Sequence, residues 1–185
     1  MFLRNVKLGA AFLAAIMVLT ACSTSGNAST KAEINANVRS ALASFDNYVA
    51  GGHELRSKAA GVLVFPDVVK GGVGLGGEYG QGALLVNGQI VDYYDIMAGS
   101  VGFQLGVQVK SEVILFMDRA SLNKFRNSEG WEIGVDGSVA VVTVGVGGEV
   151  DSNSLQQPVL GFVFSNKGLM YNLTLEGAKV HKRNR

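Results

Sequence analysis

The chain has 185 residues, of which 48% are hydrophobic, and its 16 basic residues nearly balance its 15 acidic ones. This length suits one domain with a hydrophobic core. A formal net charge of +1 excludes the strong basic field that attracts nucleic acid, and a single cysteine excludes a disulfide within the chain.

Residues 1–21 have the features of a secretory signal peptide. Arg4 and Lys7 form a basic start, and an uncharged apolar run then continues to Ala21. This run is shorter than the ~20 residues that span a bilayer, and it matches the apolar region of a signal. The stretch LTAC, ending at Cys22, resembles the bacterial lipobox, which implies a diacylglycerol thioether on Cys22 and an acyl chain on its new amino terminus. The alternative is an ordinary cleaved signal followed by an incidental cysteine.

Residues 22–29 are small and polar and are predicted to be a flexible tether. Two or more lipid chains would hold the protein stably at a membrane, whereas one chain binds only marginally. Because Ser23 rather than an aspartate follows the cysteine, resemblance to lipoprotein sorting favours the outer membrane. The expected location is therefore the bacterial cell envelope, with the protein lipid-anchored.

An amphipathic helix is predicted over residues 30–50. The sequence Thr30-Lys31-Ala32-Glu33 fits a capping box, and Gly51-Gly52 is typical of a helix end. Apolar residues recur on one face, at positions 34, 38, 42, 45 and 49. This face is expected to pack on a sheet, and a membrane interface is the alternative. A second short helix is predicted over residues 53–60.

Short strands are predicted next: residues 61–66, closed by Pro66, two strands within 71–86, one over 90–97, and two over 100–117. The pair Asn87-Gly88 predicts a hairpin turn. Residues 118–127 predict a short helix that Asp118 caps. Alternating valines predict strand structure over 134–150, and residues 158–177 predict a hairpin before a basic tail.

The expected fold class is α+β: one or two N-terminal amphipathic helices packed on a twisted, mostly antiparallel, barrel-like sheet of seven to nine short strands. Closely spaced turns favour antiparallel pairing, since a parallel crossover takes about a dozen residues or more. Glycines inside strands indicate bends or close backbone approach.

Candidate catalytic, metal and cofactor sites are not evident in the sequence. Residues 72–77 satisfy the pattern G-x-G-x-x-G, but no helix is predicted to open on it, so structural glycines are the better interpretation. The two histidines, His53 and His181, form no ligand cluster. We therefore expect no enzyme activity, no metal and no cofactor.

Basic residues are the candidate binding groups, because each Lys or Arg near anionic headgroups contributes ~1 kcal/mol. Arg56, Lys58 and Lys70 flank the first predicted strand. Lys179, Lys182 and Arg183 lie in the tail, and Lys31 and Arg39 lie in the first helix. The alternative is a solvated edge with a disordered tail.

Residues 59–180 resemble the SYLF domain, also called the Ysc84 actin-binding domain family. The stretches AAGVLVFPDVVKGGVGLGGEYGQGALLV, MAGSVGFQLGVQVKSEVILFM, GSVAVVTVGVGGEV and NKGLMYNLTLEGAKV occur in the family's order. The resemblance implies that residues 30–185 form a lipid-binding domain, and that Lys70 and Lys167 match basic positions of the family. The resemblance also brings in the binding partners of the family, whose eukaryotic members bind phosphoinositides and in some cases actin.

The expected function is therefore that of a membrane-anchored lipoprotein that binds phospholipids, through anionic or phosphoinositide-type headgroups, without catalysis. The alternative is a structural or interaction protein that docks another envelope component. Actin is a partner only by resemblance, and the helix has few basic residues, which weakens the case for a phosphoinositide preference.

Overall fold

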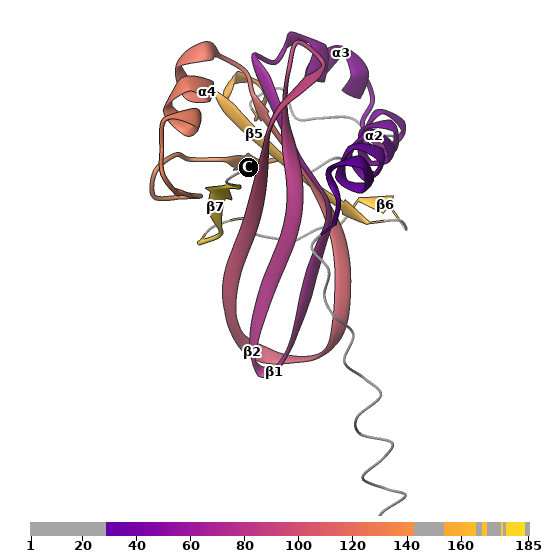
Figure 1. Cartoon of the computed structure of the whole chain (residues 1–185), viewed down its shortest axis with the longest axis vertical. Helices are drawn as coiled ribbons and strands as arrows, with labels where there is room; N and C mark the ends of the chain where they lie inside the picture. The colour runs from indigo at the N-terminus through magenta and orange to yellow at the C-terminus, as the bar shows by residue number, and fades with distance from the viewer. Residues whose placement is uncertain (1–28, 143–153, 166–167, 170–174, 176, 184–185) are drawn as a thin grey trace, which may run out of the picture.

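The computed structural model describes residues 29–142, 154–165, 168–169, 175 and 177–183 of the chain. Helices and strands follow one another along it in an α+β arrangement (Figure 1). The elements are α2 (Lys31–Tyr48), α3 (Gly52–Lys58), β1 (Gly61–Val86), β2 (Gln89–Phe116), α4 (Arg119–Arg126), β3 (Trp131–Glu132), β4 (Ala140–Val141), the 3-10 turn η1 (Ser154–Gln156), β5 (Val159–Ser165), β6 (Gly168–Leu169) and β7 (Lys179–Lys182).

The predicted first helix is confirmed, together with its start signal. Thr30 caps α2, and both hydrogen bonds of the capping box with Glu33 are present. The apolar stripe from Ile34 to Val49 is buried and packs with residues of β1, β2 and β5. The apolar face of α2 therefore packs on the sheet, which decides between the two predicted locations for it. The short second helix is confirmed as α3.

β1 and β2 form one long hairpin. Asn87 and Gly88 make its turn with φ of 51° and 74°, as the predicted hairpin turn requires. The prediction of several short strands over 61–117 is wrong, because β1 has 26 residues and β2 has 28. Pro66 does not end a strand. The register shifts between Phe65 and Val68, and this irregularity accommodates the proline inside β1.

The hairpin folds back on itself at the end far from the helices (Figure 1). Its first limb pairs residues 61–72 of β1 with 106–116 of β2, and its second limb pairs 74–86 with 89–102. The register shifts again between Gly72 and Gly74, in a glycine-rich stretch. The limbs lie against each other, since a Cβ added to Gly80 would be 2.8 Å from Val68 Cγ2.

The sheet has seven strands among the described residues, in the order β3-β7-β2-β5-β4, with β1 beside β2 and β6 beside β5. All pairings of these strands are antiparallel except that of β4 with β5. The predicted α+β class and mostly antiparallel sheet are therefore confirmed. The strand lengths differ from the prediction, as described above.

Two apolar cores cover the two faces of this sheet, and α2 and α4 lie on opposite sides of the strands (Figure 1). Under α2, the Phe45 and Phe162 rings meet edge to face at 4.9 Å. Under α4, the Phe125 ring lies 4.9 Å from Phe116 and 5.3 Å from Trp131. The predicted helix over 118–127 and its Asp118 cap are confirmed.

The region after α4 differs from its prediction. Residues 134–139 are not a strand, and Val135 is 73% exposed, so the alternating valines there do not indicate a buried face. Only Ala140–Val141 forms a strand, and residues 143–153 lie outside the described part. The terminal hairpin is confirmed where Phe164 pairs with Leu169. In the basic tail, Lys179–Lys182 form the strand β7 rather than a disordered segment.

Candidate functional site

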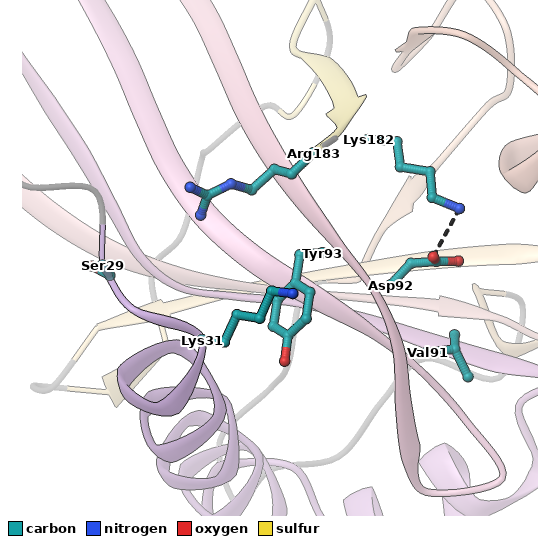
Figure 2. A pocket seen from close by; sticks show the side chains of 7 residues that line it. All are labelled: Ser29, Lys31, Val91, Asp92, Tyr93, Lys182 and Arg183. Carbon is teal, nitrogen blue, oxygen red and sulfur yellow. Dashed lines mark ion pairs between the residues drawn. The ribbon is translucent and has the colours of Figure 1, made fainter. Parts of the chain in front are cut away.

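A surface pocket of about 580 Å³ lies where the start of α2 meets β2 and the end of β7. Two chain segments that are far apart in sequence bring basic side chains to it, and β2 adds an acidic, an aromatic and an apolar side chain (Figure 2). It is lined by Ser29, Lys31, Val91, Asp92, Tyr93, Lys182 and Arg183. Three of the predicted lipid-contacting residues, Lys31, Lys182 and Arg183, therefore meet in one place.

Lys31 is positioned by the capping box, because it is the first residue of α2. Its amine lies 5.4 Å from the centre of the Tyr93 ring, a cation–π arrangement (Figure 2). The Tyr93 hydroxyl donates to Asn35 Oδ1 at 2.9 Å, which ties β2 to α2. The Thr30 backbone and hydroxyl donate to Glu33 and lower the pKa of its carboxyl.

Lys182 and Arg183 reach the pocket because β7 pairs with β2. Lys182 faces Tyr94 in the register, and the Arg183 backbone N–H donates to the Tyr93 carbonyl at 2.9 Å. The Lys182 amine lies 2.8 Å from Asp92, whereas Arg183 lies 3.6 Å from Asp95 (Figure 2 shows the Lys182–Asp92 pair). Pairing of β7 with β2 thus brings two cationic side chains, Lys182 and Arg183, to the pocket.

The pocket has an excess of positive charge. Its lining contains three basic side chains and one carboxylate, Asp92. Asp92 is already shared between Lys182 and Arg126, which lies 3.6 Å from it. Within the described part of the chain, Lys31 has no carboxylate within ion-pair distance. Such a site can accept an anionic group.

Most other predicted contact residues serve the fold. Arg56 makes two hydrogen bonds to Asp46, at 2.8 and 2.7 Å, and joins α3 to α2. Burial opposes ionisation of Asp46, but the hydrogen bonds and charge of Arg56 outweigh it and lower the pKa of that carboxyl. Lys179 pairs with Glu132 at 3.1 Å. These side chains are not gathered around one pocket.

The remaining predicted residues are scattered. Arg39 is exposed on α2, and it does not line the pocket. Lys58 pairs with Glu54 at 2.7 Å. Lys167 and the predicted lipidation site Cys22 lie outside the described residues.

Lys70 belongs to a buried charge cluster that the sequence analysis missed. Glu78 accepts from Lys70 at 2.9 Å and from Lys110 at 2.6 Å, and Lys110 also lies 3.0 Å from Glu112. Lys110 and Glu112 are 4% and 1% exposed. Lys70 and Glu78 lie in different limbs of the hairpin, so the cluster (Lys70, Glu78, Lys110, Glu112) holds the limbs together. The charged residues at every second position in Val109–Val113 (VKSEV) were the available signal.

The carboxyl groups of this cluster differ in their ionisation. Burial opposes the charge of Glu78, but hydrogen bonds from Lys110 and Lys70 outweigh it, so the pKa of Glu78 is lowered. Burial raises the pKa of Glu112 despite the nearby Lys110. Glu112 Oε2 has no hydrogen-bond partner among the described residues. The cluster is therefore a structural network in which one carboxyl group, that of Glu112, is incompletely hydrogen-bonded.

A second basic depression, of about 620 Å³, includes Lys58, Arg119 and Arg126 in its lining. It lies between α3, the β1–β2 turn and α4. The sequence analysis did not select Arg119 and Arg126, although their spacing of seven places them on one helix face. This depression provides a comparison for charge effects on binding.

Among the described residues, no group of three His, Cys, Asp or Glu side chains comes together as metal ligands would. No described helix is long and apolar enough to cross a membrane. A search of curated proteins found no match to the chain. Residues 97–185, just under half of the chain, match the family model Ysc84, Las17-binding protein actin regulator, and over this stretch the predicted resemblance is confirmed.

Proposed function

We propose that this protein is a membrane-anchored lipoprotein that binds anionic phospholipid headgroups without catalysis, through the pocket at the start of α2. Cys22 is its lipidation site, residues 22–29 are the tether, and the outer membrane of a bacterial envelope is its location. The observation that carries the proposal is that Lys31, Lys182 and Arg183 meet in one pocket. Lys31 has no carboxylate partner among the described ion pairs, and a headgroup phosphate would supply an anionic partner for its amine.

The place of the pocket supports this assignment. Ser29 both lines the pocket and directly follows the segment that leads from Cys22. An anchor on Cys22 would therefore keep the pocket near lipid headgroups. The similarity to the Ysc84 family also supports a binding role rather than a catalytic one.

The test is flotation of a chain that begins at Ser23, and so has no anchor, with acidic and neutral vesicles. The triple variant Lys31→Gln, Lys182→Gln and Arg183→Gln is expected to bind acidic vesicles less tightly by ~1 kcal/mol per side chain. At low salt that total is about a 100-fold loss of affinity. Binding of the parent chain is expected to weaken as salt rises.

The matched control changes Lys58, Arg119 and Lys124 to glutamine, which removes the same charge from α3 and α4 and leaves the pair of Arg126 with Asp92 intact. This variant is expected to keep most of its affinity. Equal losses in both variants would mean that binding is diffuse. No enrichment of the parent chain on acidic vesicles at low salt would contradict the headgroup proposal.

The second candidate is an interaction protein of the envelope, and the family description supports it because it names protein binding and actin regulation. Crosslinking in cells distinguishes the two functions. A single dominant protein adduct, together with no vesicle binding, would favour the second candidate.

A further inference from the structure

At the folded end of the hairpin, residues 68–80 of β1 and 96–110 of β2, the polar and apolar side chains that the structure describes are reversed relative to a surface in water. Lys70, Glu78 and Lys110 are at most 17% exposed and pair with one another between the limbs. Their sequence neighbours Val69, Tyr79 and Val109 are 44%, 46% and 49% exposed. The charged residues therefore point inward and the apolar residues point outward.

The outward apolar surface extends over both limbs. Val107, on the first limb, is 74% exposed, and Met97, on the second limb, is 45% exposed. Between Lys70 and Glu78, and between Asp95 and Lys110, the sequence contains no charged residue. The described side chains of the folded end thus present apolar groups outward, while its charged groups pair with one another between the limbs.

This pattern fits a lipid bilayer better than water. Exposed apolar surface that is contiguous over an element marks an interaction site, and a bilayer accepts an end that is apolar on both sides. Tyr79 suits the boundary, since its ring is exposed while its hydroxyl interacts with Gln81 and Asp95, at 2.8 and 3.3 Å. Backbone groups at free strand edges limit the depth to the headgroup–acyl boundary, where water still reaches them.

An anchor on Cys22 would also hold a membrane near this end. The Ser29 backbone N–H donates to Gln81 Oε1 at 3.0 Å, so the chain leaves the fold beside the second limb, two residues from Tyr79. Six residues lie between Cys22 and Ser29, and the seven steps of ~3.4 Å that join them reach about 24 Å at most. We propose that the folded end of the hairpin inserts into the headgroup–acyl boundary of the membrane. This inference rests on the proposed membrane anchoring but not on the headgroup pocket.

The test uses tryptophan fluorescence of the full chain reconstituted into phosphatidylcholine vesicles. Some vesicles contain lipid brominated near the glycerol end of its acyl chains, which quenches indoles at that depth. Trp131 is the only tryptophan and is 2% exposed, so the unsubstituted chain supplies a constant background. The variant Val107→Trp is expected to lose most of its added emission in brominated vesicles.

The matched control is Val135→Trp, because Val135 is 73% exposed but lies outside the folded end. Its emission is expected to stay unchanged. Met97→Trp reports the second limb independently, and circular dichroism checks that each variant is folded. Equal quenching of the Val107→Trp and Val135→Trp variants would overturn the proposal, as would an unquenched Val107→Trp variant that crosslinks to a second copy. Because these vesicles contain no anionic lipid, failure of the headgroup pocket would leave the quenching unchanged.

Discussion

Replacing Lys110 with methionine is expected to lower the free energy of unfolding by about 3–5 kcal/mol, the cost of breaking a buried ion pair. Lys110 is 4% exposed and its amine contacts Glu78 at 2.6 Å and Glu112 at 3.0 Å. Methionine preserves most of the volume of the lysine side chain. It leaves Glu112, which is 1% exposed, without a positive partner. Urea unfolding followed by Trp131 fluorescence measures the difference.

The deficit of the Lys110→Met variant is expected to depend on pH. Because the pKa of Glu78 is lowered in the folded protein, its ion pairs stabilise the fold above the ordinary carboxyl pKa of 4.5, and this contribution is lost as pH falls through the folded pKa. Ionisation of Glu112 has the opposite effect on stability. Because the pKa of Glu112 is raised in the folded protein, its ionisation destabilises the fold as pH rises above 4.5. The variant should therefore approach the parent chain in acid, where both carboxyls are protonated.

Two companion variants test the cause. Adding Glu112→Gln to Lys110→Met removes the unpaired buried charge and should recover part of the loss. Lys58→Met breaks an exposed pair, in which the two side chains are 65% and 70% exposed, and should leave the free energy of unfolding nearly unchanged. A loss below about 1 kcal/mol for Lys110→Met would mean that the cluster contributes little.

Sequence reasoning worked where the signal is local. The capping box at Thr30, the apolar stripe of α2, the Asn87-Gly88 turn and the Asp118 cap each depend on residues a few positions apart, and the structure has all of them. Strand length could not be predicted in this way, and the strands β1 and β2 are much longer than expected. A proline and a run of glycines look like strand ends in one dimension, whereas pairing with β2 continues through both as a bulge and a bend.

The candidate site was only partly predictable for the same reason. The sequence identifies the basic residues, but the role of each one depends on the carboxylate with which it pairs in the folded chain. Lys182 meets Asp92 and Arg183 meets Asp95 across some 90 positions of sequence, only because β7 pairs with β2. Arg56, which was predicted to contact lipid, also links two helices through Asp46. Local pattern supplies the charge, and long-range topology determines whether that charge is available to a ligand.

Replacing Gly82 with alanine is expected to be the most disruptive single methyl addition among the described residues. A Cβ at this position would collide with the Val64 carbonyl oxygen and lie 2.6 Å from Phe65 Cδ1. Val64 belongs to the other limb of β1, and its side chain is fully buried, so neither limb can yield without opening a core. We expect a loss of at least ~4 kcal/mol, or no cooperative unfolding at all, because backbone rather than a flexible side chain must move.

Gly99→Ala is the matched control for Gly82→Ala, because Gly99 also lies in the hairpin and no described heavy atom is within 4 Å of its added Cβ. It is expected to be neutral or to stabilise the fold by ~0.4–1 kcal/mol, since alanine restricts the unfolded chain. Urea unfolding of both variants, with circular dichroism of the folded state, measures the contrast. If the two variants were equally stable, the limbs would have to lie farther apart at Gly82, and the bend that brings the charge cluster together would have a different shape.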